Sequence, residues 1–207
     1  LYPTHQLGPI AKLLNINRGN RILSAVSDAS KARGVHHWIE KNRPDDSELM
    51  RADWKEGDVV TSILRCAGGE TIVLTHACTL PRPYSRDGRI QGTRGLWLEE
   101  RDAVFVEDDA SQTVSNPDGE HHWSPLSDYK AEYRHPLWVE YDRKGIAKEG
   151  HNDMDYLVLC AFADSLEYGE PPIDVYDTAT WMAVTYLSEQ SVAMGGTPIP
   201  MPDFTSG

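Results

Sequence analysis

The sequence is short of positive charge. Its 207 residues include 32 acidic and only 20 basic side chains, which gives a formal net charge of −12. A nucleic-acid groove needs a basic surface that displaces counterions, so this balance argues against DNA or RNA as a partner. The same balance disfavours adhesion to an anionic membrane surface.

Cysteine is also scarce, with only Cys66, Cys78 and Cys160. None forms a CxxC pair and each lies in an apolar run, so we expect buried free thiols. A disulfide between Cys66 and Cys78 across a hairpin stays open but has no support. No stretch approaches the roughly 20 apolar residues of a membrane span. No signal peptide is visible, and a sequence without an initiator Met leaves both cytoplasm and periplasm open.

Several motifs of common enzyme classes are absent. The sequence contains no GxGxxG after a strand, no GxxxxGK[ST], no HExxH and no GxSxG. The Gly pairs in AGGE and MGGT instead indicate a hairpin turn and a helix stop. Adjacent histidines at 36–37 and 121–122 cannot both point to one site from a regular element, so we expect no metal site.

Hydrophobic periodicity predicts the order of the elements. Helices are expected at 8–16 with Pro9 in the first turn, at 30–43 with Gly34 as a weak point, partly over 132–150, at 154–169, and at 179–196 with Asp177 or Thr178 as the cap. Strands are expected at 21–29, 58–66, 71–80, 95–100 and 103–108. Short turns join the middle strands, which therefore run antiparallel. We predict an α+β fold, a mostly antiparallel open sheet with helices packed on one face.

The stretch Tyr2-Pro3-Thr4-His5 stands just before the first predicted helix. Pro3 fixes its own φ and restricts Tyr2, so a rigid turn would present a phenol, a hydroxyl and an imidazole near a helix N-terminus. Tyr and His can both move protons, and the helix end favours polar or negative ligands. A packed Tyr and a capping Thr is the alternative interpretation, and the residues alone leave both open.

Four long segments together resemble one family. They are residues 2–21, 81–97, 132–138 and 171–204, which read YPTHQLGPIAKLLNINRGNR, PRPYSRDGRIQGTRGLW, EYRHPLW and PPIDVYDTATWMAVTYLSEQSVAMGGTPIPMPDF. They resemble the C-terminal half of Gfo/Idh/MocA-type oxidoreductases, most closely glycoside hydrolase family 109, which includes NAD-dependent α-N-acetylgalactosaminidases. The resemblance implies that residues 1–207 form the C-terminal substrate-binding and oligomerisation domain. An N-terminal Rossmann domain with the dinucleotide loop would be missing from the chain.

The resemblance also implies site residues. The sugar would contact Tyr2, Pro3, Thr4 and His5, and Tyr2 would also lie against the nicotinamide of NAD. Tyr84, in a loop held by prolines and Gly88, would contact the sugar as well. Either Tyr2 or His5 would transfer the catalytic proton, and the choice between them is open.

The implied reaction is a redox-assisted glycosidase reaction on N-acetylgalactosaminides or related glycosides. It comprises hydride abstraction at carbon 3, elimination, water addition and re-reduction, and needs no pair of catalytic carboxylates. One alternative is an NAD(P)-dependent sugar or polyol dehydrogenase of the same superfamily. Another is a non-catalytic binding or oligomerisation domain, since the chain alone is expected to be inactive. A homo-oligomer would form through a sheet face rich in Trp97, Val104 and Phe105.

One segment departs from the family pattern. Where the family has His-Gly-Gly-Met-Asp, this chain has His151-Asn152-Asp153-Met154-Asp155. Asn and Asp tolerate left-handed φ better than most residues, so the turn is expected to survive. Larger side chains would hinder the approach of a ligand to that backbone, which bears on sugar specificity more than on the fold. His151 and Asp155 would either line the cleft or belong to an Asx-capped helix start.

Overall fold

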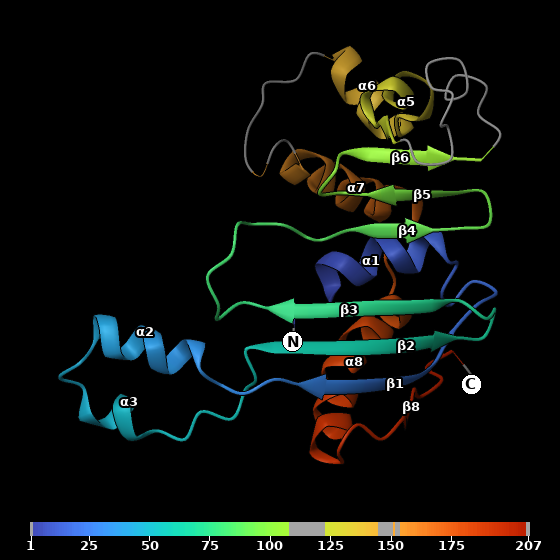
Figure 1. Cartoon of the computed structure of the whole chain (residues 1–207). Helices are drawn as coiled ribbons and strands as arrows, with labels where there is room; N and C mark the ends of the chain where they lie inside the picture. Colours follow the sequence, from blue (N-terminus) through green and yellow to red (C-terminus); the bar gives the residue numbers. More distant parts are fainter. Residues whose placement is uncertain (1, 108–122, 145–150, 152–153, 206–207) are drawn as a thin grey trace. The chain divides into compact units, whose positions relative to one another are not determined.

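The computed structural model describes residues 2–107, 123–144, 151 and 154–205, and it comprises two compact units (Figure 1). The first unit takes Leu1–Arg82 and Pro171–Gly207, and the second takes Pro83–Glu170. The α+β class is confirmed, and the antiparallel strands are divided between two four-stranded sheets. The two predicted hairpins therefore form, one in each sheet.

The first unit is built on a sheet of order β3-β2-β1-β8. Its strands are β1 (Ile22–Ala29), β2 (Val59–Cys66), β3 (Thr71–Ala77) and β8 (Ile199–Pro200), all antiparallel to their neighbours. Its helices are α1 (Thr4–Leu13), α2 (Gly34–Asn42), α3 (Ser47–Arg51) and α8 (Val175–Ala193). Helix α8 crosses behind β1 and β2 in Figure 1.

The second unit has a sheet of order β4-β5-β6-β7. Its strands are β4 (Arg89–Gln91), β5 (Gly95–Leu98), β6 (Ala103–Val106) and β7 (Ser124–Pro125), and its helices are α5 (Ser127–Tyr133), α6 (Pro136–Lys144) and α7 (Met154–Tyr168). An aromatic chain ties α6 to α7, since the buried Tyr141 ring lies 5.8 Å from Trp138 and 5.9 Å from Tyr156.

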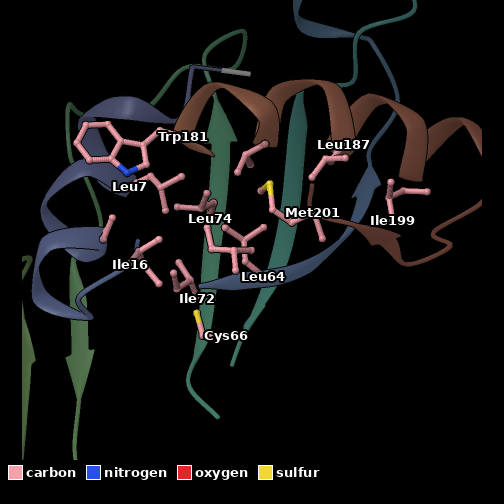
Figure 2. Close-up of a cluster of buried hydrophobic side chains, with 14 residues drawn as sticks. Leu7, Ile16, Leu64, Cys66, Ile72, Leu74, Trp181, Leu187, Ile199 and Met201 are labelled. Atoms are coloured by element: carbon pink, nitrogen blue, oxygen red, sulfur yellow. The ribbon is translucent and has the colours of Figure 1, made fainter. Parts of the chain in front are cut away.

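The core of the first unit follows from strand alternation. Val60, Leu64 and Cys66 of β2 point inward, whereas Ile63 and its neighbours on the other face are exposed. Apolar residues from α1, α8 and the sheet complete one cluster (Figure 2). Burying such side chains contributes about 1.5–3 kcal/mol each, so this cluster holds α1 and α8 on one face of the sheet.

Four buried serines line the contact between α8 and the sheet. The Ser27 hydroxyl donates to Ser62 at 2.7 Å, and Ser191 accepts from the Ser27 backbone N–H at 2.8 Å. Ser62 reaches Ser188 of α8 at 3.4 Å. Small side chains let the helix approach the strands closely, and mutual hydrogen bonds satisfy their polar atoms.

Two helices begin earlier than predicted. Helix α1 begins at Thr4, so Pro9 lies inside it and the prediction of Pro9 in the first turn is wrong. Pro9 has no N–H to donate to the His5 carbonyl, which loosens the helix at that residue. Helix α8 begins at Val175 because Asp174 is its N-cap, and Asp177 completes a capping box instead of capping the helix itself.

Gly34 begins a helix instead of weakening one. A Cβ at this position would lie 2.2 Å from the Thr79 carbonyl oxygen and 2.9 Å from an Asp58 carboxylate oxygen. Asp58 accepts hydrogen bonds from the backbone N–H groups of Arg33 and Gly34 at 2.7 and 2.8 Å, and from the Thr79 hydroxyl at 2.6 Å. The buried carboxylate thus fixes the start of α2 against the end of the β2–β3 hairpin.

Helix α7 is confirmed, but its apolar face is only partly the predicted one. The residues that turn toward the rest of the chain are Leu157, Cys160, Ala161 and Ser165, all half-buried. The spacing of apolar residues in 154–169 predicts Val158, Phe162 and Leu166 on the same face as Leu157, but these three are exposed by 61–72%. The apolar residues of this helix are distributed around it, so the sequence periodicity did not resolve which stripe is covered.

The prediction that each cysteine is a buried free thiol is confirmed in full for Cys66 alone. All three thiols are free, with Cys66 buried, Cys160 half-buried and Cys78 exposed. Burial raises the pKa of Cys66 to about 11, so this thiol is unreactive. Cys66 is the last residue of β2, at the turn end of the hairpin, and Cys78 follows β3 at the open end, so the two thiols lie at opposite ends of the hairpin.

The predicted oligomerisation patch does not lie on one face. Trp97 pairs with Val104 and Leu96 pairs with Phe105 across β5 and β6. Neighbouring residues of a strand point to opposite faces, so Phe105 lies on the other side of the sheet from Trp97 and Val104. The homo-oligomer stays a prediction without this patch. None of the helices in the described part of the chain combines the length and apolarity that a membrane crossing needs.

Candidate functional site

Tyr2 and His5 form an exposed aromatic pair at the start of α1. Their ring centroids lie 4.9 Å apart with an interplanar angle of 67°, an edge-to-face contact. Tyr2 is 60% exposed and His5 is also exposed, whereas Pro3 between them is buried. A buried Pro3 therefore lies between two exposed side chains, a phenol and an imidazole, of types that can transfer protons.

The geometry contradicts the alternative of a packed Tyr and a capping Thr. The N-cap is Pro3, in the helical region with φ −82° and ψ −19°, and no side chain caps the helix. Thr4 and His5 are the first two helical residues, so their backbone N–H groups belong to the open end of α1. A polar ligand at this helix end meets N–H donors, a phenol and an imidazole together.

The other end of α1 is fixed to α8 by charge. Asp177, whose side chain is 1% exposed, accepts from both guanidinium nitrogens of Arg18 at 2.7 and 2.8 Å and from Lys12 at 3.1 Å. Arg18 also reaches Asp174 at 3.2 Å, and the Lys12 ammonium donates to the Pro172 carbonyl. A buried carboxylate thus receives a bidentate and a single charge-assisted bond.

This arrangement predicts a pH-dependent stability. Burial would raise the pKa of Asp177, but hydrogen bonds from Arg18 and Lys12 outweigh it and hold the pKa at about 2. Because this lies below the unfolded value of about 3.9, the ionised form contributes about 2 kcal/mol above pH 4, and the contribution is lost as pH falls to about 2. We expect the difference in free energy of unfolding between wild type and Asp177→Asn to shrink over that interval in urea titrations. A constant difference would contradict the assignment.

Tyr84 lies in the second unit, in the loop before β4. Its ring is 87% exposed, and the Nε–H of Arg86 donates to its hydroxyl oxygen at 3.2 Å. The loop is anchored at Gly88, whose N–H donates to Glu99 at 2.8 Å and whose Cβ position would lie 2.8 Å from the Trp97 ring. The Tyr84 phenol is thus exposed in an anchored loop, and its contact with a sugar, which the family resemblance implies, stays a prediction.

His151 and Asp155 form a second pair in the second unit. The His151 Nδ1 lies 3.0 Å from each Asp155 carboxylate oxygen, and this hydrogen bond raises the pKa of His151. His151 has φ +39°, in the left-handed region. Asn152 and Asp153, the departure from the family pattern, lie outside the described residues.

No metal-binding cluster is found in the described ranges. Within 2–107, 123–144, 151 and 154–205, no three His, Cys, Asp or Glu side chains gather at metal-binding distances. His36 and His37 lie on α2, and His121 and His122 lie outside the described residues.

Sequence reasoning missed one contact of a candidate residue in each unit, Arg86 with Tyr84 in the second and Asp177 with Lys12 in the first. Arg86 was not singled out, because an arginine in a polar loop has no distinctive pattern. Asp177 was expected to be a cap, and its role as the acceptor for Lys12 and Arg18 depends on contacts across about 160 residues. The Asp174-x-x-Asp177 spacing of a capping box was the signal that could have located the start of α8.

The fold places the chain in a known structural class. It superposes on an oxidoreductase domain protein from Kribbella flavida with a TM-score of 0.54, covering 97% of this chain and 51% of that one at 15% identity. The likeness extends to the fold and agrees with the oxidoreductase-type architecture that the sequence resembled. No site residue is transferred at this level of identity.

The chain belongs to the glycosyl hydrolase 109 family, whose C-terminal domain matches residues 1–207. It is 44% identical to an α-N-acetylgalactosaminidase of Tannerella forsythia and 37% identical to one of Shewanella oneidensis, in each case over its whole length. A glycosyl hydrolase family 109 protein of Parabacteroides distasonis is 41% identical. The chain spans 42–44% of the length of these relatives.

Proposed function

We propose that this chain is the substrate-binding half of an NAD-dependent glycosidase acting on α-N-acetylgalactosaminides or related glycosides. The observation that supports this most is the exposed Tyr2–His5 pair at the open end of α1, in a chain of the glycosyl hydrolase 109 family. The dinucleotide-binding domain would be supplied by the rest of the full-length protein, because the chain spans less than half of its relatives.

The residues present fit one end of the cofactor. Tyr2 offers an exposed ring at the start of α1, suited to lie against a planar nicotinamide. The sequence contains no glycine-rich dinucleotide loop, so the chain would not hold NAD alone. When bound, NAD⁺ supplies reversible hydride transfer at carbon 3 of the sugar.

The protein's own contribution is proton transfer and orientation. A ketone at carbon 3 acidifies the proton on carbon 2, and His5 or Tyr2 would remove it, after which the aglycone leaves from carbon 1. Histidine titrates near neutral pH, which suits a group that accepts and returns a proton in one cycle. Thr4 and Pro3 would shape the same turn, and Tyr84 would donate its hydroxyl hydrogen to the sugar, because Arg86 already donates to the phenol oxygen.

Two outcomes of one experiment separate this function from a dehydrogenase of the same superfamily. The full-length protein is denatured as purified and the supernatant is analysed for NAD⁺ and NADH. The same batch is assayed on a chromogenic α-N-acetylgalactosaminide without added cofactor. We expect dinucleotide in the supernatant and cleavage by the intact protein.

The other results would revise the proposal in different ways. Retained dinucleotide without cleavage would support the proposed cofactor but contradict the proposed substrate. The Asn152-Asp153 replacement would then be the first feature to test as the cause of a different sugar specificity. Absent dinucleotide, with turnover of a free sugar only on addition of NAD, would favour the dehydrogenase and contradict the glycosidase.

A further inference from the structure

Helix α1 is fixed to α8 at two levels. In its middle, a Cβ at Gly8 would lie 3.4 Å from the six-membered ring of Trp181, an indole that is only 6% exposed. Figure 2 shows Trp181 and Leu7 of α1 at the same end of the buried cluster. At its C-terminal end, Lys12 and the following Arg18 meet Asp177 on the first turn of α8.

Asn17 adds a neutral bond to the same junction. Its amide nitrogen donates to the Thr180 hydroxyl at 3.1 Å, one turn after Asp177. Three side chains, those of Lys12, Asn17 and Arg18, therefore donate hydrogen bonds to the start of α8. The acceptors are its N-cap Asp174, and Asp177 and Thr180 within the helix. Only Lys12 lies in α1, and Asn17 and Arg18 lie in the segment that follows it, so these directional bonds fix the C-terminal end of α1 against the start of α8.

A small change in the direction of α1 at this junction would displace the Tyr2–His5 pair at the other end of the helix. His5 lies seven residues before Lys12, which is about 10 Å along a helix that rises 1.5 Å per residue. A tilt of about 10° at the Lys12 end would move the backbone of His5 by about 2 Å. A displacement of about 1 Å at a catalytic group can cost about 10²-fold in rate.

We propose that Asp177 is a positioning residue for the Tyr2–His5 pair, acting through Lys12 of helix α1 and through Arg18 in the segment that follows the helix; this rests on the proposed function of that pair. Replacing a whole buried ion pair by apolar packing is often nearly neutral in stability, so stability alone does not account for a charged junction at this place. The bidentate bond from Arg18 does specify one orientation. The hydrogen bonds of this junction thus serve to place α1.

The experiment compares Asp177→Asn with wild type in the full-length protein, with histidines labelled by ¹³C. In wild type the edge-on contact with Tyr2 gives the His5 ring proton signals a ring-current shift, identified by its loss in Tyr2→Leu. We expect Asp177→Asn to lose this shift. We also expect kcat to fall by about tenfold or more while KM changes by less than about threefold, since placement acts on the transition state.

Matched variants separate an effect on the placement of α1 from a general loss of stability. Asp203→Asn breaks the partly exposed Arg21–Asp203 pair in the same unit and should leave both readouts unchanged. Asp177→Glu keeps the charge and should restore part of both. If Asp177→Asn does not fold, Gly8→Val widens the α1–α8 contact instead, with Gly8→Ala as its tolerated counterpart because 3.4 Å is an ordinary contact distance.

Two results would overturn the proposal. The first is a His5 signal and a kcat per folded molecule that stay at wild-type values in Asp177→Asn, even where the melting temperature falls. The second is equal loss in Asp203→Asn. If the wild-type protein cleaves no glycoside, the proposed function fails, while the His5 signal still decides whether Asp177 positions the pair.

Discussion

Replacing His5 by alanine in the full-length protein is expected to lower kcat on an α-N-acetylgalactosaminide by about 10²–10⁴-fold, the usual contribution of a positioned proton-transfer group. The imidazole is exposed at the first turn of α1 and contacts the Tyr2 ring at 4.9 Å. It is not part of the buried cluster, so its removal should leave the fold and the retained dinucleotide intact. Steady-state kinetics and dinucleotide release from the denatured variant are the two measurements.

His37→Ala is the matched control for this prediction. His37 is an exposed histidine on α2 of the same unit and has no part in the proposed site. Its variant should retain wild-type kcat and dinucleotide. If His5→Ala instead loses the dinucleotide or unfolds, its role is structural and the assignment of proton transfer is wrong. If only Tyr2→Phe loses activity, the proton-transferring group is the phenol.

Gly34→Ala is expected to give the largest loss of stability. The added methyl would stand 2.2 Å from the Thr79 carbonyl oxygen and 2.7 Å from its carbon, both backbone atoms that cannot rotate away. Moving α2 to relieve the clash would lengthen the hydrogen bonds that Asp58 receives from Arg33 and Gly34. We expect a loss of about 3 kcal/mol in the free energy of unfolding, at the upper end for overpacking.

Gly92→Ala provides the comparison. A Cβ at Gly92 meets no atom within 4 Å, and its φ lies outside the left-handed region. Its free energy of unfolding should stay within about 0.5 kcal/mol of wild type. Equal stability of the two variants in urea denaturation would show that the approach of α2 to Thr79 is not as close as described.

The β2–β3 hairpin was the most predictable part of the fold, whereas the short strands β4, β7 and β8 were not predicted. The alternation in 58–66 and 71–80 and the Gly pair between them predicted the β2–β3 hairpin to within a few residues, because one face is buried and the other is exposed. Helix starts were less predictable. Pro9 marked a helix start by its usual preference, but packing of Leu7, Gly8 and Ala11 against the core extends α1 back to Thr4.

The candidate site residues stay a prediction from the family resemblance, and the contacts around them could not be predicted from the sequence. Tyr2, His5 and Tyr84 were identified by segments that resemble a family, and the exposure of all three agrees with that identification. The Asp177 junction depends on residues some 160 positions apart, and no local pattern encodes such a contact. The contact of Arg86 with Tyr84 spans only two residues but depends on a loop conformation set by Gly88 and Glu99.

The most direct test of the central claim is to run the cleavage by the full-length protein in D₂O and to examine the released sugar by proton NMR. Removal of the carbon 2 proton by His5 or Tyr2 exposes that position to solvent, so the product should carry deuterium at carbon 2. Free sugar incubated in the same buffer without protein should carry none. A product that keeps hydrogen at carbon 2 would show direct hydrolysis of the glycosidic bond and would contradict the proposed role of the Tyr2–His5 pair.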